Sequence, residues 1–142
     1  MQERRNWRNF DWLWLQLAAA NMAFSLALRL WGFQQVLAGS NRLAGYLRRT
    51  RREPPTEFVE DVRLRIRKIK RHGPVRGKCL SRSLAIYWVL RRYSVESSIR
   101  IGVKRGVQNF IAHAWVEVGG QPVNAGPEVN LRYAVFEQNF GA

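Results

Sequence analysis

Residues 110–124 read FIAHAWVEVGGQPVN and contain the clearest sign of a β-sheet in the chain. Phe110–Val118 is rich in aromatic and β-branched residues, and Gly119-Gly120 separates it from a second short run. A Gly-Gly pair between two strand-like runs predicts a hairpin with a two-residue loop. Upstream, Ile99–Lys104 alternates apolar and polar residues, as a half-buried strand does. We therefore expect an antiparallel sheet in the C-terminal part of the chain.

Three helical zones precede this sheet. The first covers about residues 7–48, with a break expected at Gly32 or at residues 39–41. The second begins at Thr56, a suitable N-cap, and carries an apolar stripe at helical spacing, namely Phe58, Val62, Ile66 and Ile69. The third begins where a Gly/Pro-rich loop, residues 73–78, reaches Cys79. Helices followed by an antiparallel sheet indicate the α+β class.

The length of 142 residues fits a chain with one sizeable core. We expect residues 1–55 to form a helical, Arg- and Trp-rich region that packs on the core or on a partner, and residues 56–142 to form the core itself. The run from Trp12 to Leu28 is largely apolar and at the short limit for a membrane span. We interpret it as a helix buried against the domain or a partner, and we leave peripheral membrane contact open.

The charge is strongly unbalanced. The chain carries 20 arginines and four lysines against 10 acidic residues, which gives a net charge of +14. Such a surface attracts acidic partners, which include nucleic acid, anionic lipid and acidic peptides or proteins. The single cysteine excludes an intrachain disulfide framework and a multi-cysteine zinc site, and it fits a reducing compartment.

That cysteine, Cys79, is the candidate nucleophile. A helix start favours thiolate over thiol because its unpaired N–H groups and its dipole attract negative charge. The same N–H groups, that of Cys79 included, are suited to stabilise an oxyanion. His113, on the expected strand, is the candidate base that takes the thiol proton and later protonates a leaving amine. A small buried cysteine and a hydrogen-bonded structural histidine remain the alternatives.

A third group should hold the other ring nitrogen of His113. With a two-residue loop at residues 119–120, Trp115 pairs with Asn124, and Asn124 shares the face of His113. This parity predicts a Cys79-His113-Asn124 set, and a longer loop or a bulge would reverse it. Glu117 lies on the same face but further along, where we expect a solvated or ion-paired carboxylate. With one cysteine, two histidines and no metal-ligand spacing, a metal site is a weak alternative.

Four segments together carry a family resemblance: Lys78–Ala85, Ile101–Val103, Ala112–Val118 and Pro122–Asn124. Over roughly residues 60–135 the chain resembles the transglutaminase-like leader peptidases of lasso-peptide biosynthesis, the microcin-processing type in its short stand-alone form. The resemblance implies a papain/transglutaminase-like fold in which a helix with Cys79 packs on a small antiparallel sheet with His113. It also implies a bacterial cytoplasmic cysteine peptidase that removes the leader from a ribosomally made precursor and needs no cofactor.

The same resemblance implies partners. In such systems a separate leader-recognition protein binds and delivers the precursor, and an ATP-dependent cyclase then closes the lasso ring. One feature departs from the family, whose members commonly carry an aspartate after the hairpin, often as an Asn-Asp pair. This chain reads Asn124-Ala125, so either Asn124 orients His113 or the usual carboxylate is missing. An acyltransferase of the same fold and a basic nucleic-acid-binding or scaffold protein are the rival interpretations.

Overall fold

A computed structural model describes residues 7–46, 57–72 and 79–136. The described residues form five helices and four strands in the order α1 (Trp7–Leu30), α2 (Phe33–Tyr46), α3 (Glu57–His72), α4 (Cys79–Arg92), β1 (Ser98–Arg105), β2 (Phe110–Val118), β3 (Gln121–Pro122), α5 (Val129–Arg132) and β4 (Ala134–Val135). The predicted order of helices followed by a sheet is confirmed, and the fold is α+β. The expected cap Thr56 and the loop at 73–78 lie outside the described residues.

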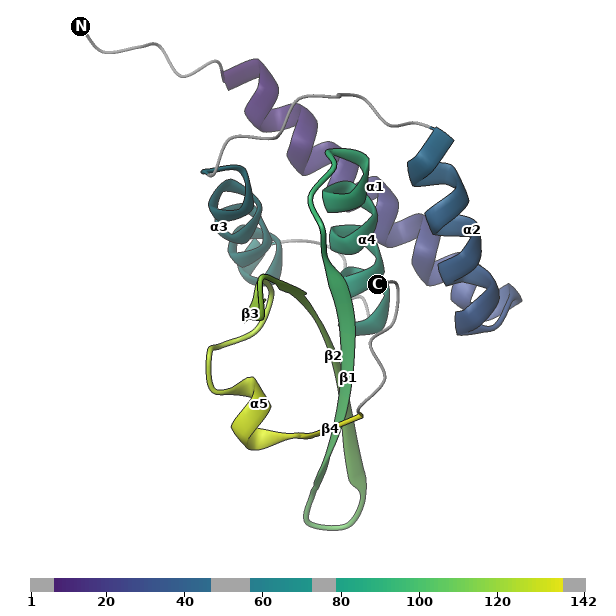
Figure 1. The fold of residues 1–142 in the computed structure, drawn as a ribbon, viewed down its shortest axis with the longest axis vertical. Coiled ribbons are helices and arrows are strands. Elements are labelled where there is room, and N and C mark those ends of the chain that lie inside the picture. The colour runs from purple at the N-terminus through teal and green to yellow at the C-terminus, as the bar shows by residue number, and fades with distance from the viewer. Residues whose placement is uncertain (1–6, 47–56, 73–78, 137–142) are drawn as a thin grey trace, which may run out of the picture.

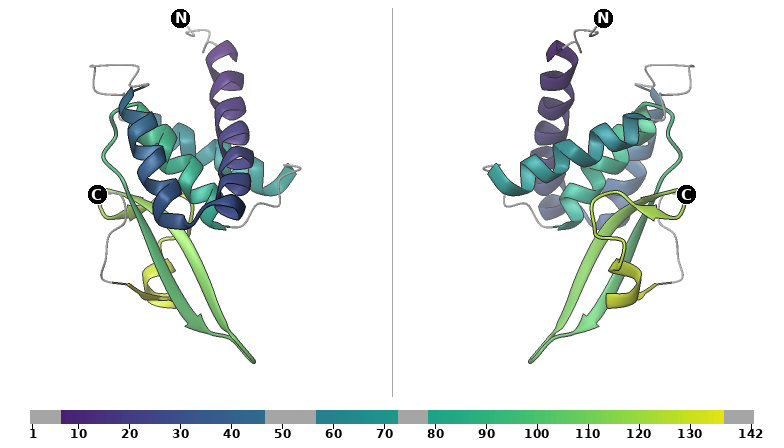
Figure 2. Two further views of the ribbon diagram at one scale, coloured as in Figure 1. Left: turned by 90° about the vertical axis from the view of Figure 1, so that its right-hand side faces the viewer. Right: turned by 90° about the vertical axis from the view of Figure 1, so that its left-hand side faces the viewer.

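The sheet is antiparallel, with the strand order β3-β2-β1-β4 (Figure 1). β1 and β2 form a long hairpin that extends away from the helices (Figures 1 and 2). At the next turn Gly119 and Gly120 have φ angles of 57° and 75°, and Val118 pairs with Gln121. Positive φ at both central residues defines the primed turn that matches strand twist, and glycine adopts it without strain. The predicted two-residue hairpin is therefore confirmed.

Helix α4 lies at the centre of the hydrophobic core. Five of its apolar side chains are almost completely buried, namely Leu84, Ile86, Tyr87, Val89 and Leu90. They share one cluster with residues of the sheet and of all three preceding helices: Ile99, Val116, Val62, Ile66, Leu13, Leu17, Val36 and Leu37. Each fully buried aliphatic side chain contributes about 1.5–3 kcal/mol. Packing on several sides fixes the position of α4, and with it the position of Cys79 at its start.

The N-terminal helices are also tied to α4 by polar contacts. Arg92 Nη1 donates to Gln16 Oε1 of α1 at 2.8 Å, and the Tyr87 hydroxyl donates to Asn41 Oδ1 of α2 at 2.6 Å. The helical break falls at Gly32, between α1 and α2, whereas residues 39–41 lie inside α2. Residues on both sides of position 55 therefore belong to one hydrophobic core. The division of the chain into two regions at residue 55 stays a prediction.

Helix α3 buries the predicted stripe where its side chains are described. Val62 and Ile66 are almost fully buried, while the Ile69 side chain lies outside the description. Arg65, which does not belong to this stripe, is also buried. Burial lowers the pKa of its guanidinium, and the nearby Asp61 and Tyr93 act in the opposite direction. One arginine of α3 therefore lies inside the protein and not on its solvated face.

Candidate active site

Cys79 is the first residue of α4 and is half-buried. The predicted helix start is therefore confirmed. The first turn of α4 carries no acidic side chain, so no carboxylate in it opposes the positive end of the helix. Ser83, one turn further along the same helical face, is completely buried.

His113 lies in the middle of β2, opposite Gly102 of β1. Its imidazole packs against two aromatic rings, the Trp115 ring at a centroid distance of 5.9 Å and the Tyr133 ring at 5.3 Å, and these two rings also contact each other at 6.2 Å. A Cβ at position 102 would lie 2.8 Å from Tyr133 Cβ and 3.1 Å from the Trp115 ring. Only glycine at position 102 therefore leaves room for this aromatic packing.

Asn124 is buried and bonds with both ends of its amide. Val116 N–H donates to Asn124 Oδ1 at 2.8 Å, and Asn124 Nδ2 donates to Ser83 Oγ at 3.1 Å. The predicted strand pairing of Trp115 with Asn124 is wrong, because β3 ends at Pro122. Val123 N–H still donates to Val116 O at 2.8 Å. At the next position the Asn124 side chain, in place of a backbone carbonyl, accepts the hydrogen bond from Val116 N–H. The role of Asn124 toward His113 stays a prediction.

Ser83 connects the cysteine helix to the histidine strand. Its hydroxyl donates to the carbonyl oxygen of Ala114 at 3.0 Å, and Ala114 directly follows His113. Cys79 stands four residues before Ser83, which is about one helical turn. The structure thus joins α4 to β2 one turn from Cys79 and one residue from His113, with Asn124 bonded to both elements.

Glu117 is ion-paired and hydrogen-bonded, as expected. Its Oε1 accepts from Trp115 Nε1 at 3.0 Å and from Asn130 Nδ2 at 3.3 Å. Its Oε2 lies 3.8 Å from Arg100 Nε. This carboxylate therefore links the C-terminal end of β2 to Arg100 of β1 and to Asn130 of α5.

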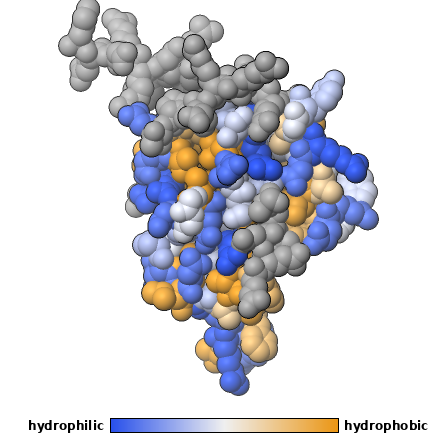
Figure 3. Space-filling model, in the orientation of Figure 1, coloured by the Kyte–Doolittle hydropathy of each residue, from blue (hydrophilic) through white to orange (hydrophobic). Residues whose placement is uncertain are grey.

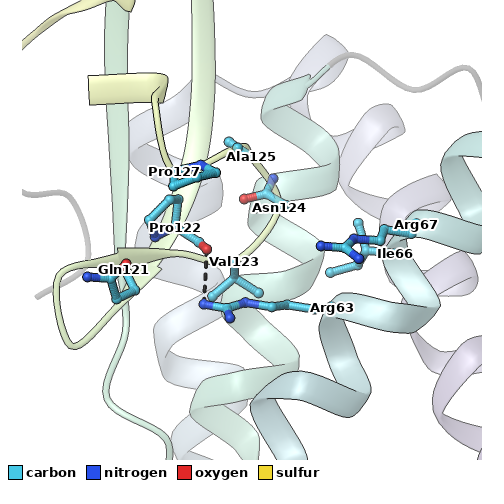
Figure 4. Close-up of a pocket in the computed structure, with 10 residues that line it drawn as sticks. Arg63, Ile66, Arg67, Gln121, Pro122, Val123, Asn124, Ala125 and Pro127 are labelled. Carbon is cyan, nitrogen blue, oxygen red and sulfur yellow. Dashed lines mark hydrogen bonds between the residues drawn. The ribbon is translucent and has the colours of Figure 1, made fainter. Parts of the chain in front are cut away.

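A polar pocket of about 360 Å³ adjoins Asn124 (Figure 4). It is lined by α3, by β3 and by the segment that follows β3, namely Arg63, Ile66, Arg67 and residues 121–127. Arg63 Nη2 donates to Pro122 O at 3.1 Å, and Arg63 Nη1 pairs with Glu60 at 3.2 Å. Arg67 is exposed at the same pocket. Two guanidinium groups make this pocket suited to a carboxylate.

Sequence reasoning missed two contributors to the site, Ser83 and Tyr133. Ser83 lies inside the segment 78–85. The one sequence signal for its role is that a polar residue stands on the face of the helix that is expected to be buried. Tyr133 belongs to the segment after the hairpin and packs against Gly102. Gly102 was therefore the sequence signal for a contact at this point of β1. A glycine inside a strand indicates close approach by another group.

The fold and these residues define a class of protein. The family model described as the transglutaminase-like superfamily matches residues 20–138, so the chain belongs to that superfamily. The microcin J25-processing protein McjB of Escherichia coli is 33% identical to this chain over 63 residues. That alignment covers 44% of this chain and 29% of McjB, so the matched part is less than a third of the relative. No significant match was found among solved structures.

The bonds of Asn124 predict a loss of stability in Asn124→Ala. The substitution leaves the buried Val116 N–H without its acceptor, which should lower the free energy of unfolding by about 1–3 kcal/mol. Chemical denaturation followed by circular dichroism measures this change. Asn130→Ala is the matched control, because Asn130 is exposed and should cost much less. Equal losses in the two variants would contradict the structural role of Asn124.

Proposed function

We propose that this protein is a cysteine peptidase that cleaves the leader from a ribosomally synthesised lasso-peptide precursor. One observation carries the proposal: Cys79 begins a buried helix that is hydrogen-bonded, one turn later, to the residue that follows His113. Membership of the transglutaminase-like superfamily and similarity to a microcin-processing protein support the same chemistry. The proposed setting is the bacterial cytoplasm, with a separate leader-recognition protein as partner.

In the proposed reaction the Cys79 thiolate attacks the scissile carbonyl carbon after His113 takes the thiol proton. The C–N bond then breaks, His113 gives its proton to the leaving amine, and a thioester joins the substrate acyl group to Cys79. Water, deprotonated by His113, attacks this thioester. The acid product leaves and the thiol regains its proton. The backbone N–H of Cys79 points from a helix start, where it is suited to the developing oxyanion.

Asn124 acts in this scheme as a positioning residue. Its amide links Ser83 of α4 to Val116 of β2, and these two elements carry the thiol and the imidazole. Asn124 also remains our proposed orienting group for His113, since the next residue, Ala125, has no polar side chain. An amide stabilises an imidazolium less than a carboxylate does.

The basic surface gives the proposed substrate or its carrier a place to dock. The net charge is +14, and the face in Figure 3 shows blue hydrophilic surface around separate orange patches. Arg63 and Arg67 border the pocket beside Asn124, the proposed third residue of the site. We propose that they bind an acidic stretch of the leader or of the recognition protein.

The proposed nucleophile predicts complete loss of cleavage in Cys79→Ala. The assay incubates purified protein, precursor and the recognition protein, and mass spectrometry follows the free leader and the core peptide. His72→Ala is the control, since we assign no role to the other histidine, and it should cleave at the wild-type rate. Undiminished cleavage by Cys79→Ala would refute the proposal. A product that carries the acyl group on an amine, rather than as a free acid, would instead identify an acyltransferase.

The proposed docking role predicts weaker processing in the double variant Arg63→Glu, Arg67→Glu. Reversal of two charges at the pocket should raise the KM for the precursor by about tenfold or more, because it repels an acidic ligand. Alkylation of Cys79 by iodoacetamide should stay at the wild-type rate. Arg42→Glu with Arg105→Glu changes the same total charge at two exposed positions away from the pocket. If both double variants raised the KM equally, the change in net charge alone would explain the effect. That result would refute a specific docking site at Arg63 and Arg67.

A further inference from the structure

Helix α1 turns an apolar stripe away from the protein. The stripe consists of exposed residues spaced three or four apart, so that they share one helical face: Trp12, Leu15, Ala19, Met22, Leu26 and Leu30. Leu15 is 50% exposed, Met22 62% and Leu26 59%. We call these six residues the outer stripe. An apolar surface of this length is unusual on a soluble protein unless it is an interaction site.

The opposite face of α1 explains why the outer stripe cannot turn inward. Leu13 and Leu17 are buried in the core, and so are two polar side chains, Gln16 and Asn21. Gln16 accepts the hydrogen bond from Arg92 of α4. The helix therefore presents mixed polar and apolar groups to its own domain, while the six residues of the outer stripe, all of them apolar, face outward with Arg29 beside them. A rotation that buried the outer stripe would break the Gln16–Arg92 bond and expose core leucines.

The length and composition of α1 indicate which kind of partner binds the outer stripe. Trp12–Leu30 is long and apolar enough to cross a membrane, yet only 17% of the segment is buried. Because its inner face is held by α4, the helix is suited to lie along a bilayer surface rather than to span one. Its N-terminal half also rises beyond α3 and α4, as Figure 2 shows. A projecting apolar ridge fits a deformable lipid surface.

The charge of the protein and the positions of its tryptophans also favour a lipid surface as the partner of the outer stripe. Trp12 and Trp14 lie near one end of the stripe and Trp31 lies at the other, and tryptophan rings favour the level of lipid headgroups. Arg29 and Arg42 are exposed on α1 and α2. With a net charge of +14, the protein is attracted to anionic lipid, whereas two copies of it repel each other.

A shallow apolar groove between α1 and α2 extends this surface. It has a volume of about 370 Å³ and is lined mainly by apolar residues, which include Phe24, Trp31, Val36 and Leu43. Trp31 lines the groove and directly follows Leu30, the last residue of the outer stripe, in the sequence. We infer that the outer stripe and this groove bind the surface of an anionic lipid bilayer, with α1 lying in the membrane plane. The inference is independent of the proposed peptidase activity.

Vesicle flotation of the full-length protein tests this inference. Wild-type protein should float with phosphatidylcholine vesicles that contain about a third phosphatidylglycerol, and much less with pure phosphatidylcholine. The triple variant Leu15→Gln, Met22→Gln, Leu26→Gln should lose about tenfold or more in apparent affinity, because it removes the apolar face. Its thermal unfolding should match wild type, since all three side chains are exposed.

The control is a triple variant of equal chemistry elsewhere, Leu64→Gln, Val107→Gln, Leu131→Gln, at positions that are also exposed. It should bind anionic vesicles as wild type does. Equal loss in both triple variants, or no wild-type binding to either vesicle, would overturn the assignment. So would a wild-type dimer in light scattering that only the outer-stripe variant dissociates, because the stripe would then bind a second copy. Stripe-dependent capture of the leader-recognition protein without vesicle binding would likewise assign the surface to a protein partner.

Discussion

The hydrogen bonds of Asn124 are the interaction on which the candidate site depends. One buried amide satisfies the Val116 N–H of β2 and donates to Ser83 of α4, whose hydroxyl in turn donates to Ala114. These bonds hold the start of the cysteine helix beside the strand that carries His113. A buried polar network of this kind specifies one arrangement, because any shift leaves a donor or an acceptor unpaired. The surrounding apolar core contributes most of the stability, while the hydrogen-bond network fixes the position of α4 relative to β2.

The sequence predicted most of the fold because its signals are local. Alternation along Ile99–Lys104 and the Gly119-Gly120 pair predicted β1, β2 and the turn, and Cys79 begins a helix as expected. The pairing of Asn124 could not be predicted in the same way. It required β3 to continue past Pro122, whereas the strand ends there: one more backbone bond joins Val123 N–H to Val116 O, and the Asn124 side chain then accepts from Val116 N–H. Tyr133 and Ser83 meet β2 only through tertiary packing, for which no periodic pattern exists.

Two surfaces of opposite character lie on different elements of this small protein. The pocket between α3 and the segment after β3 is polar and bordered by Arg63 and Arg67, next to Asn124. The outer stripe of α1 is apolar and faces away from α4. In our account the first surface binds an acidic peptide or protein near the proposed nucleophile, and the second holds the enzyme on a membrane. The two can therefore act at the same time, since neither uses residues of the other.

The rate of Cys79 alkylation by iodoacetamide, measured against pH, tests the central claim most directly. The chain has one cysteine, so a single rate reports the thiol without a substrate, a partner or a lipid. If His113 is the base for Cys79, His113→Ala should slow alkylation near neutral pH by about tenfold or more and move its pH profile to higher pH. His72→Ala should leave both unchanged. Identical profiles for wild type and His113→Ala would contradict the pairing of Cys79 with His113.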